Sequence, residues 1–286
     1  MSIAPFALHR PRSVEEATAL LDELGEEAHL YCGGTELLLV AKLGFARFDH
    51  LVDTKTIGEL DGISLDGDVL VIGARMTHRQ IERAPLVLEH LPALAAMERQ
   101  VANIRVRSVG TLAGNLCFSD PHSDPATFLL ALDAEIESRR GDGPPRRRPV
   151  HGFVRRPYQP ELDHGELLVS VRVPIPTAGT AVVHRKFSFH ERPAATVTCA
   201  VRIADGTIAD ARIAVGSVGN RVVRAYEAEA LLVGASPLDD GALAAAGRRA
   251  AELSNPVQDA NGSPEYKAQL VDVLVRRAFR EAILAA

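Results

Sequence analysis

The sequence of 286 residues contains no tryptophan, and aromatic residues make up only 5% of it. Nucleic-acid-binding domains combine a coherent basic face with interleaved aromatic side chains. Here the formal net charge is −5, and most basic residues are scattered along the chain. The composition therefore gives no support for a nucleic-acid partner.

Cysteine is scarce, because the chain has only Cys32, Cys117 and Cys199, which lie far apart. Three separated cysteines make no disulfide framework, and no C-x-x-C pair offers a zinc or iron–sulfur site. The histidines form no set with the spacing of metal ligands, so we interpret each as a surface residue. The histidines considered are His78, His122, His151, His184 and His190. The sequence predicts no metal bound by this chain itself.

Long apolar runs are also missing, since none approaches the ~18 residues that a membrane-spanning helix needs. The N-terminus has no basic segment followed by an apolar one, so we expect no signal peptide. We expect a cytoplasmic protein, with the inner face of the membrane as the alternative location. At 47% apolar residues, the chain can bury a full core in two or three domains.

The first part of the chain alternates strand and helix patterns. Ser13 and Glu16 have the spacing of a capping box before an amphipathic helix, and Gly25 ends that helix. A strand then runs into a glycine turn, a helix is expected to open at Thr35, and a further strand begins near residue 50.

The rest of the chain contains hairpins and separate helices. Asp66-Gly67 and Asp205-Gly206 have the signature of tight hairpin turns. A helical pattern over 77–102 is broken at its prolines, and residues 139–149, rich in Pro, Gly and Arg, predict a mobile surface loop. Two helical patterns end the chain, so the order of elements favours an α+β fold.

Two turns that contain glycine are candidates for a ligand site. LYCGGTELLL (30–39) passes from a strand through Gly-Gly to a helix, and VGTLAGNL (109–116) has similar small and polar residues. Glycine has no Cβ to keep a ligand off the backbone, and exposed main-chain N–H groups can cradle an anion. The first stretch is equally consistent with an ordinary tight turn capped by Thr35, and the alternative for the second is a glycine-rich turn packed against a helix.

Neither turn fits a standard nucleotide motif. The P-loop pattern G-x-x-x-x-G-K-[ST] is absent, and so is G-x-G-x-x-G between a strand and a helix. Two well-separated turns of this kind suit a ligand with two phosphates held from two sides. We therefore predict a dinucleotide bound outside a Rossmann fold.

Five ordered motifs resemble the flavin-binding subunits of molybdenum hydroxylases, and the resemblance extends from about residue 4 to residue 284. The motifs are CGGTELLLVAK, QVANIRVRSVGTLAGNLCFSDPHSDPATFLLALDAE, GELLVSVRVP, RKFSFHERPAATVTCAVRI and GSPEYKAQLVDVLVRRAF. The family includes aerobic carbon monoxide dehydrogenases, xanthine dehydrogenases and bacterial hydroxylases of aromatic N-heterocycles.

The resemblance implies an α+β architecture with a vanillyl-alcohol-oxidase-type FAD-binding fold. Its two subdomains would cover 1–56 and 57–176, and a C-terminal α+β domain would cover 177–286. No histidine or cysteine stands at the position that covalent flavinylation uses, so FAD is expected to be non-covalent. Two partners are implied, a small subunit with two [2Fe–2S] clusters and a large subunit with the molybdenum cofactor, in a dimer of heterotrimers (a heterohexamer).

The resemblance also assigns FAD contacts to individual residues. Asp124 would accept a hydrogen bond from a flavin hydroxyl, with a helix N-cap as its alternative role. Lys186 would bring positive charge near the isoalloxazine, with a solvated strand lysine as the alternative, and Leu168 would place its backbone beside the ring. The other contacts are Leu30, Tyr31, Cys32, Gly33, Gly34, Thr35, Glu36, Leu37, Gly110, Thr111, Ala113, Gly114 and Asn115.

The sequence departs from the family pattern at two places. Ala113 replaces a usual glycine, which predicts a slightly looser loop, and Thr35-Glu36 weakens carbon monoxide as the substrate of the complex. We interpret the chain as an oxidoreductase subunit without catalytic acid or base residues, which passes electrons from partner clusters through FAD to NAD, quinone or oxygen. A stand-alone flavin oxidase and a subunit that keeps the fold without FAD are the alternatives.

Overall fold

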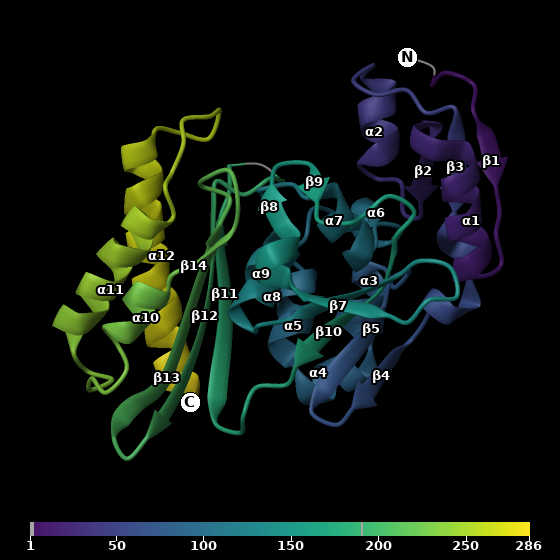
Figure 1. Cartoon of the computed structure of the whole chain (residues 1–286). Helices are drawn as coiled ribbons and strands as arrows, with labels where there is room; N and C mark the ends of the chain where they lie inside the picture. The colour runs from purple at the N-terminus through teal and green to yellow at the C-terminus, as the bar shows by residue number, and fades with distance from the viewer. Residues whose placement is uncertain (1–2, 190) are drawn as a thin grey trace.

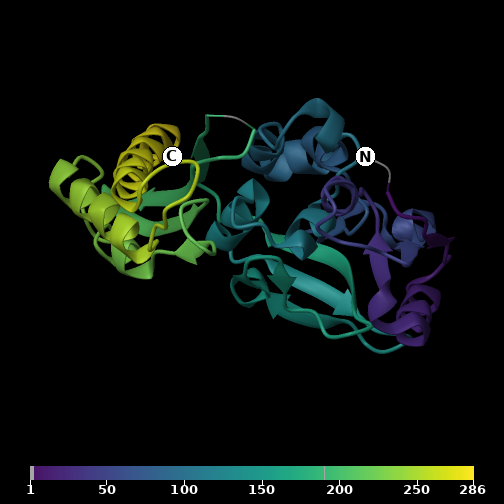
Figure 2. The same ribbon diagram turned by 90° about the horizontal axis from the view of Figure 1, so that it is seen from above.

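The computed structural model describes residues 3–189 and 191–286. Three parts, each built on one larger sheet, follow one another along the chain and across the molecule (Figure 1). The N-terminal part and the C-terminal part lie at opposite ends, as the view from above shows (Figure 2). The predicted α+β class is confirmed.

The N-terminal part is a small parallel sheet in the order β1-β3-β2, with helices beside it. Its elements are β1 (Ala7–His9), α1 (Val14–Leu24), η1 (Gly25–Glu27), β2 (Ala28–Tyr31), α2 (Leu37–Lys42), β3 (His50–Asp53) and η2 (Thr54–Thr56). Ser13 caps α1 by accepting from the Glu16 N–H, and Gly25 ends the helix with φ 62°. The Glu16 carboxylate accepts from the Arg12 N–H instead of the Ser13 N–H, so only half of the predicted capping box forms.

The middle part is an antiparallel sheet in the order β4-β5-β10-β6-β7, with short helices packed against it. Helices α4 and α5 each begin at the predicted proline breaks. The elements are η3 (Gly58–Leu60), β4 (Ile63–Asp66), β5 (Val69–Gly73), α3 (His78–Arg83), α4 (Pro85–His90), α5 (Pro92–Glu98), α6 (Ile104–Arg107), α7 (Leu112–Phe118), α8 (Asp124–Ala131), β6 (Glu135–Arg139), β7 (Arg146–Pro149), α9 (Val150–Phe153), β8 (Val154–Arg156), β9 (Gln159–Pro160) and β10 (Leu167–Pro174).

The segment 139–149, predicted as a mobile loop, belongs to the β6–β7 hairpin. Arg148 is buried and pairs in register with Ile136 of the neighbouring strand. Its guanidinium donates to both carboxylate oxygens of Glu166, at 2.8 and 2.6 Å, and to the Ser138 hydroxyl at 2.6 Å. This buried ion pair orders residues 146–149, so the loop prediction was wrong for them, whereas residues 140–145 do form the connection between the two strands.

The C-terminal part is an antiparallel sheet in the order β11-β12-β13-β14. Helices α10 and α12 cover one face of it, α11 packs on α12, and α8 of the middle part packs on the other face (Figure 1). Its elements are β11 (Thr180–Phe187), β12 (Ala195–Ala204), β13 (Thr207–Gly216), β14 (Val223–Arg224), α10 (Tyr226–Ala230), α11 (Asp240–Leu253) and α12 (Pro264–Ala285). Each sheet falls inside one of the three predicted domains, whose bounds stay a prediction.

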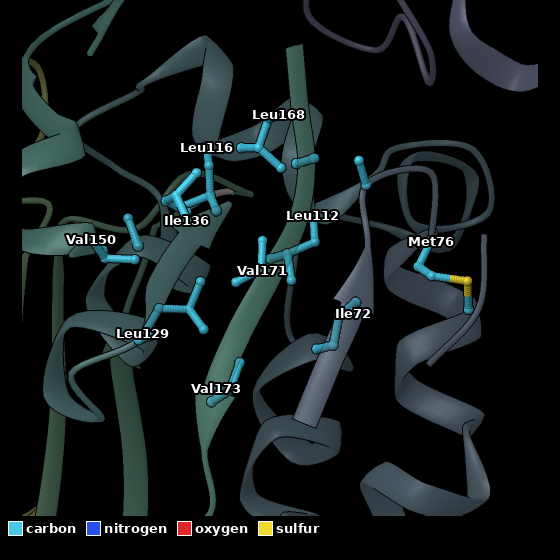
Figure 3. Packing of buried hydrophobic residues seen from close by; sticks show 14 of the residues in the cluster. Ile72, Met76, Leu112, Leu116, Leu129, Ile136, Val150, Leu168, Val171 and Val173 are labelled. Carbon is cyan, nitrogen blue, oxygen red and sulfur yellow. The ribbon is translucent and has the colours of Figure 1, made fainter. Parts of the chain in front are cut away.

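Two clusters of buried apolar side chains hold these parts together. In the first, Leu112 and Leu116 of α7 pack with Leu168 and Val171 of β10 (Figure 3). Because burying a leucine side chain contributes roughly 1.5–3 kcal/mol, this contact fixes α7 and with it the glycine turn that precedes α7. No helix among the described residues is both long and apolar enough to cross a bilayer.

Candidate functional site

A cavity of about 300 Å³ lies where the two glycine turns meet. Its walls come from the β2–α2 turn, from α7, from the α5–α6 connection and from β10. Most of the residues predicted from the sequence line it, namely Leu30, Tyr31, Cys32, Gly33, Gly34, Thr35, Glu36, Leu37, Thr111, Ala113, Gly114, Asn115 and Leu168. Segments far apart in the sequence therefore share one cavity.

The two turns contact one another directly at Gly33. A Cβ on this residue would lie 2.3 Å from the Val109 carbonyl oxygen and 2.8 Å from the Gly110 Cα. Only glycine permits this approach, since real Cβ atoms keep well beyond such distances. Gly33 thus serves contact between the turns, and Gly110 lies at that contact without lining the cavity.

The first turn carries a row of unused hydrogen-bond donors. Among the described residues, the N–H groups of residues 33–36 donate to no main-chain or side-chain acceptor, and the same holds for Thr111. Thr35 Oγ1 likewise makes no hydrogen bond within the described ranges. Buried backbone N–H groups are nearly always paired. Residues 33–36 are half-buried and all line one cavity, so their unpaired N–H groups are available to an acceptor-rich ligand.

One of the two helices next to the cavity starts later than predicted. Helix α2 begins at Leu37, not at Thr35, and Glu36 occupies its N-cap position without a side-chain hydrogen bond. Thr111 does cap α7, because its hydroxyl accepts from the Gly114 N–H at 3.0 Å. With only six residues in α2, the turn's own N–H groups are the available donors.

Asp124 and Lys186 do not line the cavity but pair with each other. Lys186 Nζ lies 2.8 Å from Asp124 Oδ2, and His184 Nε2 lies 3.4 Å from Asp124 Oδ1. Burial opposes the carboxylate charge, but the hydrogen bond and charge of His184 and the charge of Lys186 outweigh it and lower the pKa of Asp124. The N-cap of α8 is Ser123, so the alternative capping role of Asp124 was wrong.

A second cavity of about 940 Å³ adjoins the first across the turns. The two share Tyr31, Cys32, Gly33 and Thr111 in their walls, and the larger is also lined by the cations Lys55, Arg75, Arg79 and Arg83. Lys55 Nζ lies 3.7 Å from the centroid of the Tyr31 ring and donates to the Cys32 carbonyl at 3.3 Å. An elongated anionic ligand could therefore extend along both cavities.

A chain of acidic and basic side chains in alternation leads from the first turn into the C-terminal part. Arg192 bridges Glu36 at 3.5 Å and Asp120 at 2.9 Å. Burial raises the pKa of Glu36, although the charge of Arg192 offsets part of this effect. The complete chain, called the ion-pair relay below, is Glu36, Arg192, Asp120, His122, Asp259 and Lys267.

The far end of the ion-pair relay is a buried lysine. Lys267 has no exposed surface, and its Nζ lies 2.6 Å from Asp259 and 3.0 Å from the Val257 carbonyl. His122 links the two aspartates, at 3.1 Å from Asp120 and 3.5 Å from Asp259. The lysine of the last family motif thus anchors the C-terminal part to the residues around the cavity.

Two histidines predicted at the surface are buried. His78 is 2% exposed and lies 2.6 Å from Glu98, while His184 is 6% exposed and lies 2.8 Å from the Thr198 hydroxyl. The surface prediction was wrong for both because each imidazole has a polar partner inside the fold. His151 is exposed, His122 is half-buried, and His190 lies outside the described residues.

Comparison with known families decides the identity. The FAD binding domain in molybdopterin dehydrogenase matches residues 4–176, and the CO dehydrogenase flavoprotein C-terminal domain matches residues 185–282. The chain belongs to this flavoprotein family. It is an oxidoreductase subunit with the FAD-binding fold plus C-terminal domain that the resemblance implied.

Individual relatives are similar to this chain over nearly its whole length. The carbon monoxide dehydrogenase medium chain of Hydrogenophaga pseudoflava is 34% identical over 281 residues, covering 97% of this chain and 96% of that protein. The xanthine dehydrogenase FAD-binding subunit of Escherichia coli O157:H7 is 30% identical, with 97% and 96% covered. The solved carbon monoxide dehydrogenase from H. pseudoflava, which lacks the Mo-pyranopterin moiety, matches with a TM-score of 0.95 at 34% identity, covering 100% of this chain and 99% of that chain.

Sequence reasoning missed several residues around the cavities of this flavoprotein subunit. His78, Lys55 and Arg192 lie outside the glycine turns and reach the site only through the packing of other elements. No local pattern singles them out, because each stands in an ordinary polar stretch. The only signal was indirect, since Arg192 falls within the fourth family motif.

Proposed function

We propose that this subunit binds FAD along the two adjoining cavities and passes electrons from [2Fe–2S] clusters of a partner subunit to an external acceptor. The row of unused N–H donors on residues 33–36 carries this proposal. A diphosphate offers several acceptor oxygens within a small volume, which is what a group of convergent donors requires. Thr35 and Thr111 add polar contacts from the two turns.

The rest of the lining also fits the parts of FAD on either side of a diphosphate. Leu168 and Val101 give the smaller cavity apolar walls suited to a flat aromatic ring. The cations around the larger cavity suit further negative charge, and Asn115 supplies an amide at the second turn. Asp124 and Lys186 pair with each other and do not line the smaller cavity. The FAD contacts predicted for them remain proposals.

When bound, FAD supplies the capacity to accept and release electrons. The residues of this chain then have to bind and orient the cofactor and to keep water from it, and no acid or base is required of them. The ion-pair relay fixes Glu36 at the edge of the smaller cavity through Arg192. Apolar residues such as Leu162 and Leu167 exclude water from its depth.

We further propose that the chain works with a small [2Fe–2S] subunit and a large molybdenum-cofactor subunit, as a dimer of two heterotrimers in the cytoplasm. The names of the relatives as medium chain or FAD-binding subunit support this assembly. Relatives named for carbon monoxide and for xanthine are similarly distant from this chain. The substrate therefore follows from the large subunit, and the acceptor stays open among NAD, quinone and oxygen.

Purification from the natural host with the neighbouring chains, followed by absorbance spectroscopy and metal analysis, tests the proposal. We expect a yellow complex with stoichiometric extractable FAD, and molybdenum and iron in the co-purifying chains. A chain that purifies alone and oxidises a substrate with oxygen would favour the stand-alone oxidase. A complex without flavin absorbance, even after FAD is added, would favour the scaffold subunit.

A further inference from the structure

We infer that His78, oriented by Glu98, is an additional binding residue for the diphosphate of the flavin nucleotide. The inference rests on the proposed function, because it takes the glycine turns as the diphosphate site. His78 is the first residue of α3 and lines the smaller cavity together with both turns.

The backbone places His78 directly behind the second glycine turn. Its N–H donates to the Gly110 carbonyl at 3.0 Å, and Thr77 and Thr111 form an isolated antiparallel bridge beside it. The imidazole Cδ2 lies 3.4 Å from where a Cβ on Gly110 would stand. A Cβ at position 110 would thus be in ordinary van der Waals contact with the imidazole, while the Val106 carbonyl oxygen, at 2.9 Å, is the atom that it would clash with.

Glu98 holds the ring from the other side. The last residue of α5 has no exposed surface, and its Oε2 lies 2.6 Å from His78 Nδ1. The second carboxylate oxygen, Oε1, is buried without a hydrogen-bond partner in the described structure. A buried carboxylate oxygen needs a hydrogen-bond donor, so this contact holds a proton on His78 Nδ1 toward Glu98 and fixes the orientation of the ring.

The other ring nitrogen is left for a ligand. Within the described residues His78 Nε2 makes no hydrogen bond, although the side chain is almost completely buried. With Nδ1 engaged by Glu98, Nε2 is the ring nitrogen that can meet a ligand, and it donates whenever it carries a proton. The unused donors of residues 33–36 line the same cavity, so an anion there would meet main-chain donors and the imidazole together.

Other charges around His78 are already engaged. On its own helix, Arg79 pairs with Glu82 at 2.7 Å, and Arg107 of α6 lies 3.6 Å from the same carboxylate. Across the cavity, Glu36 lies 3.5 Å from Arg192. Among the side chains that the structure describes, Glu98 is the one that hydrogen-bonds to the imidazole, so the pair acts as a unit.

The test compares ligand fragments in the flavin-depleted full-length chain, alone and in its purified complex. Dissociation constants for FAD, ADP and riboflavin are measured for the wild type, His78→Gln and Glu98→Gln. We expect His78→Gln to weaken FAD and ADP at least tenfold and to leave riboflavin within twofold. Glu98→Gln should give a smaller loss with the same pattern. His29→Gln is the control, since this partly buried histidine lines neither cavity.

The outcomes separate the inference from the proposed function. If the wild type binds FAD and the folded His78→Gln variant binds ADP as tightly as the wild type does, the inference is overturned and the proposed function stands. Equal weakening of riboflavin and ADP also overturns it, because it indicates a purely structural role. Wild-type protein that binds no FAD overturns the proposed function. The double variant with both glutamines keeps a neutral hydrogen-bonded pair and repeats the comparison if His78→Gln alone does not fold.

Discussion

Lys186 of β11 donates a hydrogen bond of 2.8 Å to Asp124 of α8, which ties the C-terminal domain to the FAD-binding domain. Both side chains are largely buried, and Lys186 also donates to the Gln100 carbonyl after α5. His184, two residues earlier on β11, touches the same carboxylate. Residues expected at the flavin thus form an interdomain contact in the structure.

Removing one partner of the Lys186–Asp124 pair should lower the stability of the protein. Removal of one partner of a buried ion pair typically destabilises a protein by about 3–5 kcal/mol, because the other charge stays buried and uncompensated. We expect Lys186→Met to lower the free energy of unfolding by about that amount in urea titrations at pH 7. Arg185→Met is the control, since its partner Glu281 lies at the exposed side of the domain. Equal effects of the two substitutions would contradict the prediction.

The same carboxylate predicts a pH dependence of stability. The pKa of Asp124 is lower in the folded protein than in the unfolded chain, where it is about 3.9. Its contribution is therefore fully present above that value and is lost as the pH falls through the folded-state pKa. We expect Asp124→Asn to be less stable than the wild type at pH 7, with a difference that shrinks below about pH 4. Unfolding titrations from pH 7 to pH 3 measure this, and a constant difference would count against it.

The contact between the glycine turns predicts the effect of a single methyl group. In Gly33→Ala the new Cβ would meet the Val109 carbonyl oxygen at 2.3 Å, so the turns must separate. We expect FAD content to fall at least tenfold, while the melting temperature of the flavin-free protein changes little because neither apolar cluster is touched. Gly58→Ala is the matched control, since its Cβ meets nothing within 4 Å. Normal flavin content in Gly33→Ala would show that the turns need not touch.

Arg192 should control how fast the cofactor leaves. In Arg192→Met, Glu36 and Asp120 lose the cation between them, and the pKa of Glu36, already raised by burial, rises further. We expect FAD to dissociate faster from Arg192→Met than from the wild type, and the rise in fluorescence of the free flavin measures this rate. The rate difference should narrow at high salt, because part of the contact is exposed. Identical release rates at low salt would refute the role of this residue.

The cysteines should differ in reactivity. Burial raises the pKa of Cys117 to about 12 and raises that of Cys199 well above the usual range, so neither forms thiolate near pH 8. Cys32 and Cys117 are both half-buried, but Cys32 lines both cavities and Cys117 lines only the smaller one. We expect alkylating reagents to modify Cys32 first in the flavin-free protein, and added FAD to slow that reaction. Mass spectrometry of the peptides reads this out, and fast modification of Cys117 would contradict it.

The sequence predicted the elements whose signals are local. Ser13 and Gly25 bound α1, and the prolines divide the helices after β5. Asp205-Gly206 forms a hairpin turn, and the β4–β5 turn is Gly67-Asp68, one residue later than predicted. In each case the residue acts on its own backbone through a cap, a turn or a missing N–H. Such effects need no knowledge of distant neighbours.

The prediction failed where the partner is remote in sequence. Arg148 looked like part of a mobile loop because its partner Glu166 could not be foreseen, and His78 looked exposed because Glu98 could not be foreseen. The start of α2 was placed two residues early, since Thr35 is a good cap but keeps its hydroxyl free toward the cavity. The glycine turns were found by pattern, yet their mutual contact depends on tertiary packing.

The ion-pair relay affects which fragments of this polypeptide keep the surroundings of the smaller cavity intact. Arg192, which balances Glu36 at the rim of the smaller cavity, stands 156 positions further along the chain. A fragment that stops after β10 would retain every main-chain donor of the turns but would leave two carboxylates facing one another uncompensated. The portion that matches the FAD binding domain therefore contains every residue that lines the two cavities but lacks the arginine that pairs with Glu36.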